Sequence, residues 1–471
     1  MKRLFTILMM SMLIGLPSAF AEEPTFTEFP DEIFFNNTGG TQVTALSRNG
    51  RWASGGTYVR GGFVYDVEKD SIWLGGGGKI SDLGDMVLGS YVYNIETRKT
   101  TRLERIGDFF FSMTTDISAD GRIVTGMVGP DWTNLMPCYW EDGKFSLLPF
   151  PSTANVGRFK VNGCQARWVN GDGSVIVGYF VANPNTNLMI VWERQPDGTY
   201  QYIDTWTEFY EPQHGLVYDY DRKEYDFVKG PNPWMRMEPA AVTYDGKTVA
   251  LYLQNNYSDE MGPPYQLGFY HVDTGTIEAF PYNPNDQMGD AREFIVCGFS
   301  DYLTVCGITG ALGRDPKPFI KYYNEAPQYL NNVFPEFNRL WDYDDLMAQG
   351  MPYLCTGMSR DENVIVGYAT CVAEYWNDEG QTTQDLGFWG FSIKTGDRKS
   401  PLALAAAGKG DDNGDDNDDD DDDVIGSSVE TIGAEDLAPA EYFTLDGRKV
   451  LNPDKGIFIE KKGEKTRKIV K

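Results

Sequence analysis

The chain has 471 residues, a formal net charge of −28 and 14% aromatic residues, with 51 glycines and only two histidines. Its acidity excludes nucleic acid and anionic lipid surfaces as expected partners, because like charges repel. The many glycines and aromatic residues, without long stretches of helical periodicity, indicate a β-rich protein that is long enough for a large core.

Residues 1–21 have the three parts of a secretory signal peptide. Basic residues at positions 2 and 3 precede the apolar run Leu4–Leu16, and Ala19-Phe20-Ala21 is a small-x-small cleavage site. The apolar run is shorter than the ~20 residues of a membrane-spanning helix, and no other stretch of the sequence is a candidate. We therefore expect export, cleavage near Ala21 and no transmembrane segment in the mature chain.

Residues 22–40 follow as an N-terminal arm, and residues 41–47 have the pattern of a strand. We predict that this strand pairs with the last unit of the repeat described next and so closes a ring of sheets. Closure of this kind removes exposed sheet edges, which otherwise invite pairing with other chains.

The segment Ile117–Gly126, ISADGRIVTG, is the clearest copy of a pattern that recurs along the chain. It reads as a strand end, a tight turn at Asp120-Gly121 and a new strand with β-branched residues. In six copies a small polar residue stands eight positions before a glycine or, once, before Leu251, and a seventh copy is one residue shorter. The small polar residues are Ser47, Ser81, Ser118, Asn170, Thr243, Ser300 and Ser359.

The residues inside these turns have a structural explanation. Asp and Asn side chains bond to the backbone of their own turn, and glycine accepts a positive φ. We therefore assign turn roles to Asn49, Asp120, Asp172, Asp245 and Asp361. The glycine at the end of each copy allows a β-bulge or the close approach of two backbones.

Each turn is followed by an aromatic strand, a second polar turn and another short strand, as in Tyr139-Trp140 and then Phe145–Leu148. One unit thus contains three or four antiparallel strands. Seven such units predict an all-β fold for residues 41–399, a β-propeller in which seven is the most consistent number of blades. A β-sandwich or a stacked β-solenoid is the alternative.

These units, in which S-x-D-G turns alternate with strands that carry Trp or Phe, resemble the HAF-type extracellular repeat over about Thr41–Lys399. The resemblance implies an extracellular repeat architecture and says nothing about a ligand. Asp120 and Gly121 are adjacent, so the turn does not match the Asp-box of sialidases, which places one residue between Asp and Gly.

Six cysteines in an exported chain permit disulfides, and six allow fifteen pairings. They are Cys138, Cys164, Cys297, Cys306, Cys355 and Cys371. Cys297 and Cys306 flank the turn at Asp301-Tyr302 symmetrically, which makes them the candidate pair. The alternative for each cysteine is the role of a small buried apolar residue. The spacing has no zinc pattern, so we expect no metal site.

Two inserts interrupt the spacing of the repeat, and both are rich in aromatic residues. The first, Asp204–Met237, includes a hairpin pattern at Val217–Val228, and the second, Asn324–Gly350, includes a short helical stretch. Loops on a rigid scaffold commonly carry function, and aromatic faces beside acids can stack on sugar rings. The residues expected to contact a ligand are Trp206, Tyr210, Tyr218, Tyr220, Trp234 and Trp341. Packing of the inserts against the propeller is the alternative role.

The sequence carries no recognisable catalytic set. His214 lies in the first insert and His271 in an aromatic strand, too few for a Ser-His-Asp or metal site. No nucleophile elbow, phosphate-binding loop or dinucleotide fingerprint occurs. A carboxylate pair in the central funnel stays open, because glycosidases need only two acids about 5–10 Å apart. We assign no catalytic residue.

Residues 400–440 form a linker around the tract Asp411–Asp423. A run of like charges cannot bury an apolar core, so we expect the linker to be disordered. It allows weak, nonspecific Ca²⁺ association but lacks the spaced ligands of an EF-hand, and we expect no cofactor.

Residues 441–471 form a small β module with a basic end, and this module resembles the short C-terminal sorting-type module of secreted Bacteroidetes proteins. The matching residues are Phe443, Leu445, Gly447, Val450, Pro453, Lys455, Gly456, Ile457, Phe458 and Ile459. The resemblance implies the type IX secretion machinery as a partner. It also implies release from the cell or attachment at the outer-membrane surface.

These features together favour an exported or surface-displayed β-propeller that binds a glycan or a protein without catalysis. One alternative is a propeller glycoside hydrolase or lyase that uses acidic residues. The other is a structural component of a surface assembly.

Overall fold

The computed structural model describes the backbone of residues 22–29, 41–57, 61–105, 107, 109, 111–131, 134–151, 161–182, 186–203, 205, 215–219, 224–228, 234–255, 266–280, 294–309, 317–323, 325–335, 353–376, 382–407, 441–443, 449–450, 457–462 and 465–470. The predicted signal peptide and the Asp-rich tract lie outside these residues. The chain divides into two compact units, Met1–Gly410 and Asp411–Lys471.

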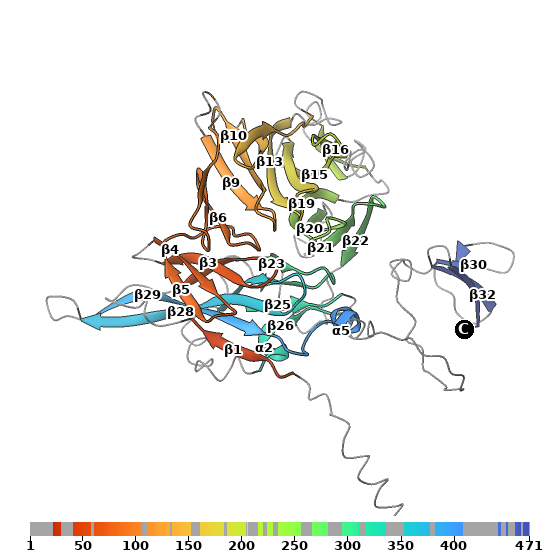
Figure 1. Ribbon diagram of the computed structural model, residues 1–471. Helices are drawn as coiled ribbons and strands as arrows, with labels where there is room; N and C mark the ends of the chain where they lie inside the picture. The colour runs from red at the N-terminus through yellow and green to blue at the C-terminus, as the bar shows by residue number, and fades with distance from the viewer. Residues whose placement is uncertain are drawn as a thin grey trace, which may run out of the picture. The chain divides into compact units, whose positions relative to one another are not determined.

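The first unit is a seven-bladed β-propeller, as predicted, and each blade is an antiparallel sheet (Figure 1). Blade 1 contains β2 (Gln42–Leu46), β3 (Trp52–Thr57), β4 (Gly61–Asp66) and β5 (Ser71–Leu74). Blade 2 contains β6 (Asp85–Leu88), β7 (Tyr91–Asn94) and β8 (Thr100–Arg102). Blade 3 contains β9 (Phe111–Ile117), β10 (Ile123–Gly129), β11 (Met136–Glu141) and β12 (Lys144–Leu147).

The other four blades follow in chain order. Blade 4 contains β13 (Val161–Val169), β14 (Val175–Ala182), β15 (Thr186–Arg194) and β16 (Tyr200–Ile203). Blade 5 contains β19 (Trp234–Val242), β20 (Thr248–Asn255), β21 (Gln266–His271) and β22 (Thr276–Phe280). Blade 6 contains β23 (Phe294–Phe299), β24 (Val305–Thr309), β25 (Lys317–Lys321) and β26 (Gln328–Tyr329). Blade 7 contains β27 (Tyr353–Met358), β28 (Val364–Trp376), β29 (Thr382–Lys394) and β1 (Thr25–Glu28).

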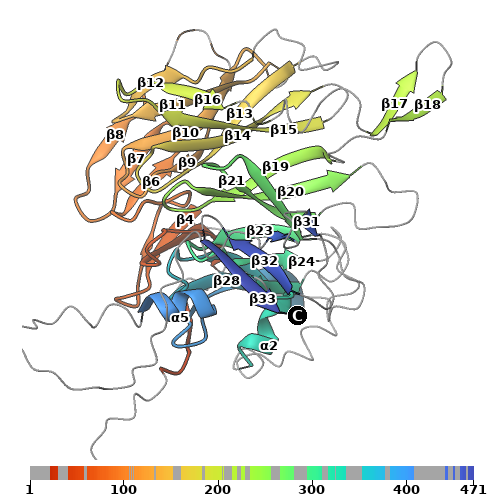
Figure 2. The ribbon, with the colours of Figure 1, turned by 90° about the vertical axis from the view of Figure 1, so that its right-hand side faces the viewer.

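Three smaller elements complete this unit. The strands β17 (Gly215–Asp219) and β18 (Glu224–Val228) form a separate hairpin within the first insert, where the sequence predicts one (Figure 2). The helix α2 (Leu330–Val333) follows β26, and the helix α5 (Pro401–Ala407) follows the last blade. No helix in the described part of the chain is long and apolar enough to cross a membrane.

A hydrophobic cluster fills each of the seven interfaces between neighbouring blades. Between blades 3 and 4, for example, Ile123 and Tyr139 pack with Trp192. The second strand of a blade lies between two clusters, and every residue of β10 is accordingly buried. Each large apolar side chain removed from water contributes roughly 1.5–3 kcal/mol. The cluster between blades 7 and 1 closes the ring through side chains.

The strand that closes the ring is β1, the outer strand of blade 7. It pairs antiparallel with β29, from Thr25 opposite Lys394 to Glu28 opposite Phe391, and Figure 1 shows it in red beside that blade. The prediction that residues 41–47 close the ring is wrong, because β2 is the inner strand of blade 1. The strand pairing that closes the ring comes instead from the four residues of β1, which the prediction places in an arm. Of residues 41–47, Thr41 alone bonds to β29 in the described structure, where its N donates to Phe388 O at 2.8 Å.

A β-bulge at one position of the inner strand explains the glycine of the repeat. In blade 3 the register shifts at Thr115, and Gly126 lies opposite the residue before it. A Cβ on Gly126 would lie 2.3 Å from Met113 O, so the close approach of the two backbones favours glycine in this blade, whereas blade 5 has Leu251 opposite Pro239 beside its bulge. The predicted bulge and close approach are thus confirmed. The bulged residues of six blades are Thr44, Thr115, Arg167, Ala240, Cys297 and Thr356.

The second unit contains one four-stranded antiparallel sheet in the order β31-β30-β32-β33. Its strands are β30 (Glu441–Phe443), β31 (Lys449–Val450), β32 (Ile457–Lys462) and β33 (Lys465–Val470). The central pair places Phe443 opposite Ile459. The sheet occupies the stretch for which the sequence predicts a small β module.

Candidate functional site

Five of the seven turns between the inner and second strands share one hydrogen-bond pattern, while the turns of blades 2 and 6 have Leu83 and Tyr302 in place of the Asp or Asn. In blade 3, Ser118 Oγ donates to Asp120 Oδ1 at 2.5 Å and accepts from Ile123 N at 3.0 Å. Asp120 Oδ1 also accepts from Arg122 N at 3.1 Å. Equivalent contacts engage the other residues assigned to these turns, which are Asn49, Asp172, Asp245 and Asp361. Each of these side chains therefore bonds within its own turn.

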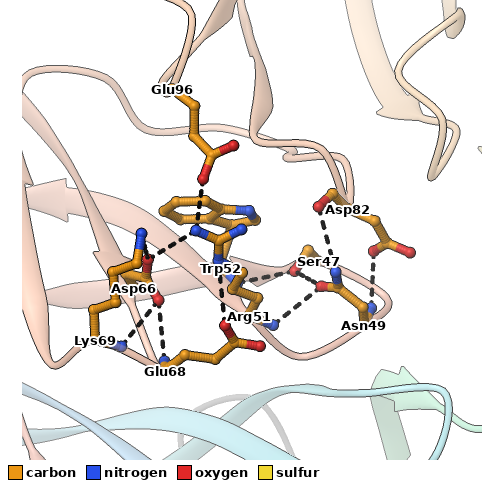
Figure 3. A network of polar contacts seen from close by, with 9 residues as sticks. All are labelled: Ser47, Asn49, Arg51, Trp52, Asp66, Glu68, Lys69, Asp82 and Glu96. Atoms are coloured by element: carbon orange, nitrogen blue, oxygen red, sulfur yellow. Dashed lines mark hydrogen bonds and ion pairs between the residues drawn. The ribbon is translucent and has the colours of Figure 1, made fainter.

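In blade 1 the turn continues into a charged cluster (Figure 3). Arg51 donates to Glu96 at 2.6 Å and to Asp66 at 3.3 Å. Its guanidinium carbon lies 4.2 Å from the centroid of the Trp52 ring. Asp66 is fully buried and also accepts from Glu68 N at 3.0 Å. Arg51 offsets part of the negative charge of Asp66 and Glu96 and joins strand residues of blade 1 to blade 2, so we assign this cluster a structural role between the two blades.

The second residues of the seven turns form a hydrogen-bonded ring. Ala119 N donates to Gly171 O at 2.9 Å, and Gly171 N donates to Tyr244 O at 2.9 Å. At two steps the acceptor is an Asp side chain: Tyr244 N donates to Asp301 Oδ1 at 2.7 Å, and Asn49 N, from the residue after Arg48, donates to Asp82 Oδ1 at 2.8 Å. The members of the ring are Arg48, Asp82, Ala119, Gly171, Tyr244, Asp301 and Arg360. One end of the central channel is therefore bordered by one residue from each blade.

The side chain of Arg48 crosses the channel at this end. Its guanidinium donates to Val242 O of blade 5 at 3.0 Å and to Val169 O of blade 4. Its Nη2 lies 3.6 Å from Asp116 Oδ2 of blade 3. Because the turn of Arg48 belongs to blade 1, these contacts reach to the other side of the ring. Arg48 therefore closes this end of the channel.

Arg360 and two aspartates complete the closed end. The guanidinium carbon of Arg360 lies 4.0 Å from the centroid of the Tyr244 ring. Burial raises the pKa of the Asp82 carboxyl, although a backbone N–H and the charge of Arg48 stabilise its ionised form. Burial likewise raises the pKa of the Asp301 carboxyl. Since both carboxylates accept main-chain hydrogen bonds across a blade boundary, they brace the ring.

None of Arg48, Asp82, Asp301 and Arg360 is a site residue predicted from the sequence. These residues occupy the position directly after the small polar residue, which holds Ala, Gly or Tyr in the other blades. A variable position inside an otherwise repeated turn is the signal that could have found them. Functional side chains are commonly placed on loops at such variable positions, because a rigid scaffold tolerates different residues there.

A cavity of about 230 Å³ lies on the inner strands next to the closed end. Its lining residues are Thr44, Ala45, Gly78, Lys79, Val87, Thr114, Thr115 and Asp116. Lys79 Nζ lies 4.6 Å from the centroid of the Trp168 ring, and within the described residues no ion pair joins it to a carboxylate. The cavity is below the roughly 300–1,000 Å³ of sites that enclose a drug-sized ligand. It therefore suits one small polar group.

The inner strands that follow the two inserts begin at the other end of the channel. The first insert follows β16, and its last four residues, 234–237, begin β19 of blade 5. The second insert, Asn324–Gly350, contains β26 and α2 and precedes β27 of blade 7. Because β19 and β27 run toward the repeat turns, their first residues lie at the end of the channel opposite Arg48.

Four of the six aromatic residues expected to contact a ligand lie outside the residues that the structure describes. Trp206, Tyr210, Tyr220 and Trp341 fall outside the described residues. Tyr218 lies in β17 and Trp234 begins β19, where the backbone alone is described. The described part of the chain therefore does not bring these six residues together, and their contact with a ligand stays a prediction.

His271 is placed in a sheet rather than in the channel. It lies opposite Thr276, its Nδ1 is 3.5 Å from Thr248 Oγ1, and its Nε2 is 3.5 Å from Glu278 Oε2. His214 lies outside the described residues. Across the described chain, no group of three or more His, Cys, Asp or Glu side chains is arranged to hold a metal ion.

The candidate pair Cys297 and Cys306 carries free thiols in the structure. Cys306 lies opposite Gly298, so Cys297 is one position out of register at the bulge. Neighbouring residues of a strand point to opposite faces, which separates the two side chains. Counting outward from the turn pairs Cys297 with Cys306 but leaves out the bulged residue, which shifts the register by one position. Cys306 contacts Cys355 instead, with 3.2 Å between the sulfur atoms.

No family model matches this chain, and no curated protein matches its sequence. Solved structures resemble its fold. The propeller domain of the Trilobed protease from Pyrococcus furiosus is 9% identical with a TM-score of 0.41, and the match covers 75% of this chain and 95% of that domain. TolB from Agrobacterium tumefaciens is 8% identical with a TM-score of 0.34 over 66% of this chain and 89% of that protein.

TolB from Acinetobacter baumannii is 11% identical with a TM-score of 0.32 over 67% of this chain. The match spans 64% of that protein, so this chain corresponds to less than two thirds of it. At these identities the likeness concerns the fold alone, and propellers serve many functions.

Proposed function

We propose that this chain is an exported binding protein whose propeller holds a carboxylate-bearing group of its ligand in the channel, without catalysis. The observation that carries the proposal is the cavity beside Lys79. The Lys79 ammonium group lies over the Trp168 ring, while Thr44 and Thr115 add hydroxyl groups to the cavity wall. Because Arg48 closes the neighbouring end, a ligand group enters from the side of the inserts and does not pass through.

We favour an acidic glycan as the ligand. The Lys79 ammonium group and the threonine hydroxyl groups of the cavity wall match the carboxylate and the hydroxyls of an acidic sugar. A cavity of about 230 Å³ takes one such sugar residue, and the rest of the chain lies toward the inserts. The protein as a whole is acidic and the charge of Arg48 is paired with Asp116, so the attraction is local to Lys79. A protein that inserts an acidic side chain is the competing ligand.

The test is a glycan array of acidic and neutral oligosaccharides, probed with the mature chain Glu22–Lys471 and with two variants. Lys79→Gln is expected to weaken binding to carboxylated glycans at least tenfold. Lys247→Gln removes the same charge from an exposed turn, where Lys247 pairs with Asp245 at 3.6 Å, and is expected to leave binding unchanged. Equal losses, or binding to neutral glycans alone, would contradict the proposed site.

The same array distinguishes the other functions. Released sugar would contradict the absence of catalysis and would favour a glycoside hydrolase or lyase. The closed-end acids are poor candidates for that chemistry, because Asp82 and Asp301 accept hydrogen bonds that hold the ring. If the chain binds no glycan on the array and co-purifies stably with envelope proteins, a protein ligand or a structural role in a surface assembly would be favoured.

Export and sorting are part of the proposal. The signal-peptide pattern at residues 1–21 and the motif in residues 441–471 support secretion by the type IX route to the outer-membrane surface or the medium. The four-stranded sheet of the second unit is compatible with a sorting module. In a host with this route, deletion of residues 441–471 is expected to retain the protein in the periplasm. Unchanged delivery to the surface would contradict the assignment.

A further inference from the structure

Cys306 and Cys355 form a pair of thiols that spans two blades. Cys306 lies in β24 of blade 6 and Cys355 in β27, the inner strand of blade 7. Their sulfur atoms are 3.2 Å apart, although 49 positions separate the residues in the sequence. Both side chains are fully buried in the hydrophobic cluster between these blades. No other contact between two thiols is found within the described residues.

We propose that Cys306 and Cys355 form a disulfide in the mature protein and staple blade 6 to blade 7. A disulfide has a sulfur–sulfur distance of about 2.05 Å, so the two atoms need to approach by roughly 1 Å. The signal-peptide pattern predicts an oxidising compartment, where disulfides persist. The staple thus depends on the proposed export but not on the proposed ligand.

The reaction is thiol–disulfide exchange with a disulfide oxidant, such as a thiol–disulfide oxidoreductase or oxidised glutathione. The thiolate of one cysteine attacks the oxidant and releases one thiolate of it, leaving a mixed disulfide. The thiolate of the second cysteine displaces the other half. The protein loses two electrons and two protons, and the oxidant becomes two thiols. Burial raises the pKa of the Cys306 thiol, so the exchange belongs to folding, before blades 6 and 7 close.

The position of the bond gives it a structural consequence. The segment between the two cysteines contains the second insert, Asn324–Gly350, so the staple would fix both ends of that insert. It would also hold blade 7, whose outer strand β1 pairs over only four residues. Cys297, at the bulge of the adjoining strand β23, is half-buried and stays the free thiol of this group.

The first experiment refolds the full mature chain in a glutathione redox buffer and maps the disulfides without reduction. Free thiols are alkylated in denaturant, and the peptides are analysed by mass spectrometry. We expect a linked pair of peptides that contain Cys306 and Cys355, with Cys297 alkylated. Alkylation of both Cys306 and Cys355, or a link between Cys297 and Cys306, would overturn the proposal. Because the wild-type chain is used, the result does not depend on whether a variant folds.

The second experiment measures thermal unfolding with and without a reducing agent. The oxidised wild type is expected to unfold about 5–10 °C above its reduced form, since a bond that closes a long loop stabilises the native state. Cys297→Ser is expected to keep this difference. The double variant Cys306→Ala, Cys355→Ala is expected to lose it. A difference that Cys297→Ser abolishes would contradict the assignment, and glycan binding measured in parallel reports separately on the proposed function.

Discussion

Two adjacent glycines in β3, Gly55 and Gly56, differ completely in the room they leave for a side chain. A Cβ on Gly55 would lie 2.0 Å from Gln42 O, whereas nothing lies within 4 Å of a Cβ on Gly56. We expect Gly55→Ala to lower the free energy of unfolding by about 1–3 kcal/mol, because the bulge must open. Gly56→Ala should change it by less than about 0.5 kcal/mol. Urea unfolding measures both, and equal effects would refute the bulge explanation.

Lys321 is a buried cation in β25. It is 5% exposed, its Nζ lies 3.9 Å from the centroid of the Phe280 ring, and it donates to Tyr322 O at 3.3 Å. Burial lowers the pKa of Lys321 to about 8. In the unfolded chain the pKa returns to roughly 10.4. Between these values the unfolded chain binds more protons, so the contribution of Lys321 to stability rises with pH.

Lys321→Met is therefore expected to increase the free energy of unfolding at pH 7 by about 1–3 kcal/mol. The gain over wild type should shrink as the pH rises from about 8 to about 10, because the wild type loses its buried charge. Lys317→Met in the same strand is the control, since the Lys317 side chain is only partly buried and lies 5.1 Å from the Tyr329 ring centroid. Denaturant unfolding at several pH values tests this prediction. An increase in the free energy of unfolding of Lys321→Met that does not vary with pH would contradict a buried charge at Lys321.

At the scale of the elements, blade 7 contains the first strand of the chain, β1, and is followed directly by the helix α5. Glu362, in the turn after β27, holds the start of α5. Its Oε2 accepts from Ser400 N at 2.7 Å, and its Oε1 accepts from Ser400 Oγ and Ser300 Oγ at 2.9 Å each. Glu362 has a φ of +63°, at the turn position where five other blades have glycine. Glu362 thus adopts an unfavourable backbone conformation, and its side chain makes contacts that glycine at this position could not make.

Glu362→Gly is expected to release α5 while leaving the turn intact. Hydrogen exchange should become faster in residues 400–407, and protease cleavage there should increase, because the acceptor for Ser400 is lost. The global unfolding midpoint should change little, since glycine adopts this φ without strain. Leu303→Gly is the matched control: Leu303 has a φ of +60° at the equivalent position of blade 6. If Leu303→Gly also accelerates hydrogen exchange in α5, the Glu362 carboxylate is not what holds this helix.

For the whole molecule, the sequence predicts the ring through its repeated turns but not the residues that close and fill it. A small polar residue equivalent to Ser118 recurs in all seven blades, and Asp or Asn at the position of Asp120 recurs in five, because the blades need similar turns; the blade count therefore follows from local chemistry. The four residues of β1 carry no motif, since any extended segment can pair with an open edge. Arg48 acts through contacts with blades 3, 4 and 5, which no local spacing reveals.

The contacts of Arg48 make the integrity of the ring testable. Arg48→Met would leave Asp116 and the carbonyls of Val169 and Val242 without their partner inside the channel. We expect the free energy of unfolding to fall by about 2–4 kcal/mol. Arg122→Met is the control, because Arg122 is an exposed arginine paired with Glu141 at 2.8 Å. This variant should lower the free energy of unfolding by less than about 1 kcal/mol.

A double-mutant cycle separates the charge pair from the carbonyl contacts. If Arg48 acts mainly through Asp116, the double variant Arg48→Met, Asp116→Asn should recover part of the loss, because no unpaired charge remains. If it acts mainly through Val169 O and Val242 O, the two losses should add. Hydrogen exchange in blades 4 and 5 should rise with Arg48→Met in either case, since these carbonyls lie there. Unchanged hydrogen exchange in blades 4 and 5 would mean that the ring is stable without the contacts of Arg48. Arg48 would then be available to bind the ligand.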